Sequence, residues 1–136
     1  MTQLAEKSVH NGMDIVRAEI NPEILDLAHL ARYTGGDVSL ESELMGLFKL
    51  QAEQQISVIL AAADKAEWDM AVHTIKGSAQ GIGAVGLAIT ARKLEDVPFE
   101  GAESQKLAVL TELKLEMVKC LDSVDQFISA ADLMGE

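Results

Sequence analysis

Hydrophobic residues recur every three or four positions over most of the chain, the spacing that places them on one face of an α-helix. The pattern predicts five helices, over about residues 21–34, 37–62, 65–82, 84–97 and 105–131. We therefore expect an all-α fold, an antiparallel four-helix bundle with one short additional N-terminal helix.

Polar residues and glycines predict where these helices begin and end. Asn21-Pro22-Glu23 indicates a helix start, because Asn caps well, Pro tolerates the first position and Glu complements the helix dipole. The segment Asp64-Lys65-Ala66-Glu67 is typical of a capping box that opens the third helix. Gly35-Gly36 predicts the end of the first helix, and Gly81 with Gly83 predicts the turn between the third and fourth.

The first 20 residues show no sustained period, so we expect a weakly ordered arm over residues 1–20 and one bundle domain over residues 21–136. Ile15, Val16 and Ile20 are the positions by which this arm could lie against the bundle. A chain of 136 residues is long enough for one buried core and too short for two.

Composition supports the helical prediction. Hydrophobic residues make up 49% of the chain, yet Phe, Trp and Tyr together make up only 4% and there are 2 prolines, which favours a bundle over a sheet. Eleven basic residues against 22 acidic ones give a formal net charge of −11. Because this charge repels a phosphate backbone, we expect no nucleic-acid partner.

Cysteine content and hydropathy indicate the compartment. The single cysteine, Cys120, lies in an apolar helical pattern and has no intramolecular disulfide partner, so we expect a buried, inert thiol in a reducing compartment. No apolar run approaches the about 18 residues that cross a bilayer, and the N-terminal sequence MTQLAEKSVHNG lacks the layout of a signal peptide. We expect a cytoplasmic monomer that does not enter a membrane.

The candidate chemistry lies in residues 72–95. On a helix, His73, Lys76, Gly77 and Gln80 share one face, because they stand at i, i+3, i+4 and i+7. The opposite face is apolar and predicts the buried side: Val72, Ile75, Ala79 and Ile82. A histidine turned away from the core, with a cation one turn on and a residue without a side chain beside it, suits a phosphoryl group.

The same stretch carries a longer motif whose positions are His73, Ile75-Lys76-Gly77-Ser78-Ala79, Gly83, Leu87, Ala91 and Leu94-Glu95. The motif resembles the signature of the histidine-containing phosphotransfer (HPt) domain family. The resemblance covers about 24 residues, and the downstream glycine, the apolar spacing and the terminal Leu-Glu make it more specific than a histidine followed by Lys-Gly. It implies that the chain is a phosphocarrier with no kinase or phosphatase activity of its own.

The chemistry of phosphoryl transfer and the family resemblance together predict a role for the main motif residues. Phosphoryl transfer to nitrogen requires a neutral imidazole whose lone pair is aimed in line at phosphorus, so His73 is the expected phosphoacceptor. Lys76 would stabilise the transferring group by its charge. The resemblance implies that Glu95 bonds the second ring nitrogen and leaves the nitrogen farther from the backbone to attack. Gly77 either clears room for an approaching protein or permits close helix packing.

The resemblance also implies the partners. Members of the family exchange phosphate with receiver domains of response regulators, and we expect one of these receivers to belong to a hybrid histidine kinase. The Mg²⁺ used in the reaction is expected on the receiver. No acidic triplet, P-loop or Cys/His cluster in this sequence indicates a cofactor or metal of its own.

The sequence gives a weaker indication of which residues bind a partner protein. Met45, Phe48, Ala52 and Ile56 widen the apolar arc of the long second helix, and Gln80 lies near His73. Such a strip indicates either a docking surface beside the reactive group or additional core contact.

Two alternatives to a phosphorelay protein remain open at this point. One is an interaction-only bundle that binds a receiver without carrying phosphate, and the presence of His73 with Lys76 and Gly77 argues against it. The other is the phosphoacceptor module of a larger histidine kinase. The Met1 start and the lack of a linker favour a stand-alone protein.

Overall fold

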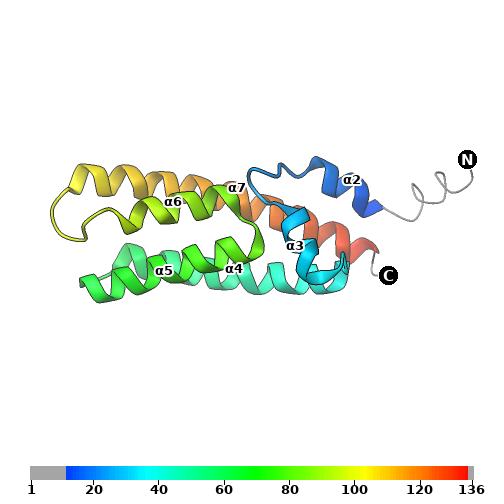
Figure 1. Cartoon of the computed structure of the whole chain (residues 1–136), viewed down its shortest axis with the longest axis horizontal. Coiled ribbons are helices and arrows are strands. Elements are labelled where there is room, and N and C mark those ends of the chain that lie inside the picture. Colours follow the sequence, from blue (N-terminus) through cyan, green and yellow to red (C-terminus); the bar gives the residue numbers. More distant parts are fainter. Residues whose placement is uncertain (1–11, 135–136) are drawn as a thin grey trace, which may run out of the picture.

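The computed structural model describes residues 12–134, which form an all-α structure (Figure 1). Its helices are α2 (Gly12–Glu19), α3 (Leu27–Thr34), α4 (Val38–Ala61), α5 (Lys65–Ile82), α6 (Val85–Glu95) and α7 (Glu103–Met134). Helices α4 to α7 form a closed ring, since α4 packs on α5, α5 on α6, α6 on α7 and α7 on α4. The predicted four-helix bundle is confirmed.

Several helix ends lie where the sequence predicts them, because the predicted capping residues are in place. The Asp37 side chain accepts a hydrogen bond from the backbone N–H of Leu40 at 3.1 Å and caps α4. The Asp64 side chain accepts from the N–H of Glu67 at 2.9 Å and caps α5. Gly35 follows α3 in the left-handed conformation with φ of 66°.

The predicted start of the first helix at Asn21 is wrong, because α3 begins six residues later at Leu27. The Asn21 side chain instead accepts from the N–H two residues on, at 2.9 Å, and closes a turn. The next segment is held by long-range contacts, since Leu25 is buried and the Asp26 N–H donates to the Gly83 carbonyl oxygen at 2.7 Å. The helix starts only after this contact, with Asp26 as its N-cap.

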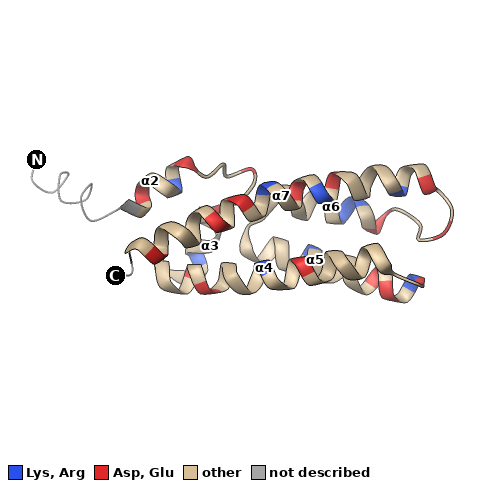
Figure 2. Cartoon of the chain, turned by 180° about the vertical axis from the view of Figure 1, so that it is seen from behind, with Lys and Arg blue, Asp and Glu red and all other residues tan. Residues whose placement is uncertain are grey.

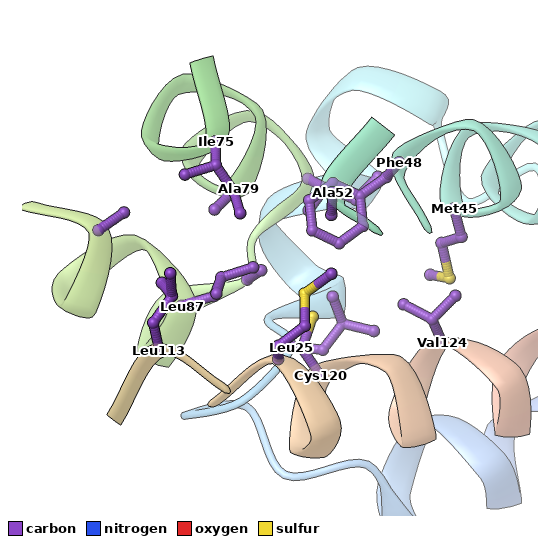
Figure 3. Close-up of a cluster of buried hydrophobic side chains, with 14 of the residues drawn as sticks. Leu25, Met45, Phe48, Ala52, Ile75, Ala79, Leu87, Leu113, Cys120 and Val124 are labelled. Carbon is purple, nitrogen blue, oxygen red and sulfur yellow. The ribbon is translucent and has the colours of Figure 1, made fainter. Parts of the chain in front are cut away.

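The core fills the ring with side chains from each bundle helix and from the loop before α3 (Figure 3). The labelled core residues are Leu25, Met45, Phe48, Ala52, Ile75, Ala79, Leu87, Leu113, Cys120 and Val124. Burial, with a smaller effect of the Glu116 charge, raises the pKa of the Cys120 thiol to about 12. The prediction that Cys120 is buried is confirmed.

Charged residues are distributed along all the helices (Figure 2), and some pair across helix boundaries. Lys49 Nζ of α4 lies 2.8 Å from Asp125 Oδ1 of α7, and Lys93 Nζ of α6 lies 3.1 Å from Glu112 Oε2 of α7. Exposed pairs of this kind contribute about 0–1 kcal/mol each, so core burial dominates the stability of the bundle.

Helix α2 falls in the segment for which the sequence predicts only a weakly ordered arm, and it packs against α7. Met13 and Ile20 are buried there, whereas Ile15 is exposed. Arg17 donates to the fully buried Glu41 of α4 and lies over the Phe127 ring of α7, 5.3 Å from its centroid. Residues 1–11 of the arm lie outside the described residues.

The turn between α5 and α6 depends on Gly83, which has φ of 89°. A Cβ at this position would lie 2.7 Å from the Asp26 carbonyl oxygen. The predicted turn role of Gly83 is therefore confirmed. The turn role predicted for Gly81 is wrong, because Gly81 lies inside α5.

We predict that Gly83→Ala lowers the free energy of unfolding by about 2 kcal/mol or more, because a left-handed alanine costs about 1–2 kcal/mol before the clash is counted. Gly81→Ala is the matched control, since nothing lies within 4 Å of its Cβ and a helical alanine gains up to about 1 kcal/mol. Urea unfolding followed by circular dichroism measures both. A Gly83→Ala protein as stable as Gly81→Ala would contradict this account.

Candidate functional site

Helix α5 carries the candidate phosphoacceptor on its outer face. The apolar side of this helix is buried against the ring, with Val72, Ile75, Ala79 and Ile82 in the core, as the sequence predicts. His73 lies on the opposite side, and 76% of its side chain is exposed to solvent. The imidazole is thus held on a rigid helix and open to a macromolecular partner.

Glu95, the last residue of α6, lies beside this imidazole. Its Oε2 is 3.7 Å from His73 Nδ1, and its Oε1 accepts a hydrogen bond from Lys76 Nζ at 2.9 Å. A separation of 3.7 Å is longer than a direct hydrogen bond, but it places the carboxylate on the Nδ1 side of the ring. The structure therefore brings together His73, Lys76 and Glu95.

The ion pair between Lys76 and Glu95 also determines the ionisation of the carboxylate beside His73. The hydrogen bond from Lys76 holds the pKa of the Glu95 carboxyl below its usual range, and the Lys76 charge and nearby His73 act in the same direction. Glu95 therefore remains an anion at neutral and mildly acidic pH. Only 21% of the Lys76 side chain is exposed, so the lysine lies along the α5–α6 surface. The sequence motif predicts a role for each of these two residues but does not predict that they pair with each other.

Glycines leave the outer face of α5 flat beside His73. A Cβ at Gly77 would meet no atom within 4 Å, so close helix packing does not explain this glycine. Gly81 lies one turn further on and has equally open surroundings. The i, i+4 spacing of the two glycines is the signal in the sequence that could have identified Gly81 as part of this face. Gln80 is exposed between them, as predicted.

The predicted docking strip on α4 is corrected by the structure. Met45 and Ala52 are buried in the core, and Phe48 is nearly so. Ile56 is half-buried and packs against that core. The wide apolar arc of α4 is explained by its position between α5 and α7, because both neighbours cover it. Met45 and Ala52 are therefore core residues and Ile56 packs against the core, whereas Phe48, although buried, also lines an apolar groove beside α5.

An open apolar groove of 710 Å³ lies where α3, α4 and α5 meet. Its lining residues are Leu30, Tyr33, Leu44, Leu47, Phe48, Gln51, Ser78, Gly81 and Ile82. Tyr33 and Leu47 are exposed at this groove, and Gly81 joins it to the outer face of α5. The helix periodicity alone does not predict the groove, because it depends on where α3 crosses the bundle.

Among residues 12–134, no group of three or more His, Cys, Asp or Glu residues could hold a metal ion. None of the helices in this range combines the length and the apolar character that a bilayer span needs.

Comparison with known proteins agrees with the site geometry. The family model described as Hpt domain matches residues 43–133, which include α5, α6 and most of α4 and α7. Searches of curated proteins and of solved structures gave no match. Hpt domains are phosphotransfer modules of two-component systems, and they interact with receiver domains of response regulators. With a match over more than half of its length, and with the motif histidine exposed on α5, the chain belongs to the Hpt domain family.

Proposed function

We propose that this protein is an intermediate of a phosphorelay. It accepts a phosphoryl group on His73 from the aspartyl phosphate of one receiver domain and passes it reversibly to another receiver. The observation that carries the proposal is the placement of the imidazole, which is 76% exposed on a rigid helix with its Nδ1 side turned to Glu95. Nε2 is left as the nitrogen that an incoming partner can reach.

The transfer step follows from this placement. The lone pair of His73 Nε2 attacks phosphorus, the bond from phosphorus to the aspartyl oxygen breaks, and its electron pair leaves on the aspartate carboxylate. The proton on Nδ1 stays on the ring, where the Glu95 carboxylate faces it at 3.7 Å. No proton has to leave the imidazole, so the step reverses readily toward a second receiver.

The charges needed in the transition state are divided between the two proteins. Lys76 contributes positive charge at the edge of the imidazole site, and the Mg²⁺ that binds the phosphoryl oxygens is expected on the receiver. The chain itself would then need no cofactor, and it would act as a carrier without kinase or phosphatase activity of its own.

The docking face we propose is the outer face of α5 together with the groove beside it. Gly77 and Gly81 leave this face flat, and the exposed Met70 and Ile89 lie on α5 and α6. A receiver must bring its phosphorylated aspartate within bonding distance of His73, and side chains at the two glycines would obstruct that approach. The expected partners are receiver domains, one of them on a hybrid histidine kinase, bound by a monomer in the cytoplasm.

The alternative of an interaction-only bundle leaves the exposed imidazole and its paired carboxylate without a function. We therefore favour the carrier. A phosphoacceptor module within a larger kinase would use the same residues for the same chemistry. Comparing the mass of the native protein with that of this 136-residue chain decides between that module and a stand-alone carrier.

We predict that His73→Gln abolishes acceptance and leaves the fold intact, because most of the side chain is exposed to solvent. Transfer of labelled phosphate from a phosphorylated receiver tests acceptance, and far-UV circular dichroism tests the fold. His29→Gln is the control, since His29 lies on α3 with its ring 5.4 Å from Tyr33. Label that accumulates on the His73→Gln protein would refute His73 as the acceptor.

We predict that Gly77→Leu weakens receiver binding by about tenfold or more, since a clash that costs about 1.4 kcal/mol has that effect. Stability should not fall, because the new side chain meets open space and leucine is a better helix former than glycine. Calorimetric titration with a receiver measures the affinity.

Gly46→Leu is the matched control for this substitution. Nothing lies within 4 Å of its Cβ, and it stands one turn before Lys49, which pairs with Asp125 of α7. The surface around Gly46 therefore lies on the side of α4 next to α7. Normal binding by Gly77→Leu, or equal losses in both variants, would show that the receiver approaches elsewhere.

A further inference from the structure

We propose that Glu41 couples the docking of α2 to the position of α3, so that α2 on the bundle holds one wall of the apolar groove in the shape that a receiver binds. The inference rests on the proposed function, because it takes the groove as part of the docking face for receivers. It gives α2 a regulatory role. Receiver affinity is high while α2 is docked and falls when α2 leaves the bundle.

The carboxylate of Glu41 joins α4 to two other helices. Glu41 is fully buried, and it is the one charged residue that is buried within residues 12–134. Its Oε1 accepts a hydrogen bond from Arg17 of α2, whose guanidinium also lies 5.3 Å from the centre of the Phe127 ring of α7. Its Oε2 accepts from the Thr34 hydroxyl of α3 at 2.7 Å. One buried group therefore holds both α2 and α3.

The charge on Glu41 makes these two contacts depend on each other. Arg17 is the cation that meets the carboxylate in the described part of the chain, and it belongs to α2. If α2 left the bundle, an unpaired anion would remain out of water, which is strongly unfavourable. The Glu41 side chain would then turn toward solvent, and Oε2 would leave the Thr34 hydroxyl. Apolar side chains of similar size often stabilise a core as well as a buried ion pair does, so what the charge adds is this dependence.

Thr34 anchors the C-terminal end of α3. Its hydroxyl donates to the buried carboxylate and accepts from the Gly36 N–H at 3.2 Å, which ties the turn after α3 to the core. The N-terminal end is anchored by the Asp26 N–H, which donates to a carbonyl oxygen in the turn after α5 at 2.7 Å. Leu30 and Tyr33, which line the groove, lie between these two anchors. Loss of the Thr34 anchor would therefore free this wall of the groove at one end.

Direct packing between α2 and α3 is a poorer route for such coupling. An open cavity of 570 Å³ separates the two helices, with Ala18 on the α2 side and Ala28 and Ala31 on the α3 side. The apolar side of α2 lies instead against α7, where Met13 and Ile20 are buried. The shared carboxylate is thus the contact that links α2 to the far end of α3.

The short length of α2 makes its docking reversible. A helix of eight residues is not stable alone in water, so α2 is helical only while its contacts with the bundle hold. Coupling between two sites is reciprocal. A receiver that binds the groove should therefore also hold α2 on the bundle.

Amide hydrogen exchange without a receiver tests the coupling in four proteins: wild type, Arg17→Met, Glu41→Gln and the double variant. Methionine removes the charge of the arginine, whereas glutamine keeps an oxygen that accepts from Thr34 and carries no charge. We predict that Arg17→Met alone speeds exchange about tenfold in α2 and in the last turn of α3, residues 31–35. In the Glu41→Gln background, Arg17→Met should leave exchange at residues 31–35 nearly unchanged.

Two results would overturn the coupling. An equal change at residues 31–35 in both backgrounds would show that the loop between α2 and α3 transmits the effect. Faster exchange in α2 without any change at residues 31–35 would show that the two helices are independent.

Thr34→Val keeps the proposal testable if Arg17→Met fails to fold, which far-UV circular dichroism detects. This substitution removes the hydroxyl that contacts Glu41 and leaves the ion pair with Arg17 in place. It should speed exchange at residues 31–35 while the α2 amides keep their wild-type rates. Wild-type exchange at residues 31–35 in Thr34→Val would refute Glu41 as the anchor of α3.

Receiver binding tests the regulatory role. The probe is an unphosphorylated receiver domain that exchanges label with the wild-type protein, titrated by calorimetry. We predict that Arg17→Met and Thr34→Val each weaken binding about fivefold or more, a common size for coupling between two sites. Lys49→Met is the matched control, because it removes an exposed ion pair of α4 with Asp125 and should leave the affinity unchanged. The bound receiver should also slow exchange of the α2 amides in wild type.

The two measurements separate the possible failures. If no receiver domain binds or labels the wild-type protein, the proposed function is wrong, and hydrogen exchange still decides whether α2 and α3 are coupled. Faster exchange at residues 31–35 with unchanged receiver affinity would refute the regulatory role, because the wall of the groove would then not affect binding.

Discussion

Burial of the inner side of α5 is the constraint on which the rest of the structure depends. This helix packs on α4 along one side and on α6 along the other, and Ile75 and Ala79 close the centre of the ring between them. Only the outer face of α5 remains available to solvent. His73 lies on that face because its position is about half a turn away from the residues that must be buried. The position of the imidazole is thus a consequence of core packing.

A second contact determines what surrounds that face. The Asp26 N–H donates to the Gly83 carbonyl oxygen at 2.7 Å, which ties the start of α3 to the turn after α5. Helix α3 is thereby held across the end of the bundle, where Leu30 and Tyr33 form one wall of the apolar groove. A side chain at Gly83 would push these two segments apart. The turn that lets α6 bring Glu95 back to His73 therefore also fixes the groove beside the site.

Local sequence patterns predict the parts of the structure that depend on local chemistry. The period of α5 separates its buried and exposed faces, and single carboxylates cap α4 and α5 where the sequence places them. The start of α3 could not be predicted in this way, because Asn-Pro-Glu suits a turn as well as a helix and the choice is made by a contact with Gly83. The same limit applies to α2, whose attachment involves long-range contacts such as the partly buried ion pair of Arg17 with Glu41. Pairing between Lys76 and Glu95 likewise depends on how α6 folds back along α5.

The glycines of α5 show how stability and function are divided between the two sides of one helix. Gly77 and Gly81 each cost roughly 1 kcal/mol relative to alanine inside a helix, and neither is needed for packing. The inner side offsets this cost, because full burial of a single side chain such as Trp68 or Ile75 contributes about 1.5–3 kcal/mol. The outer face is therefore free to be shaped by the approach of another protein. A helix whose stability came from its exposed residues could not carry two glycines beside its reactive side chain.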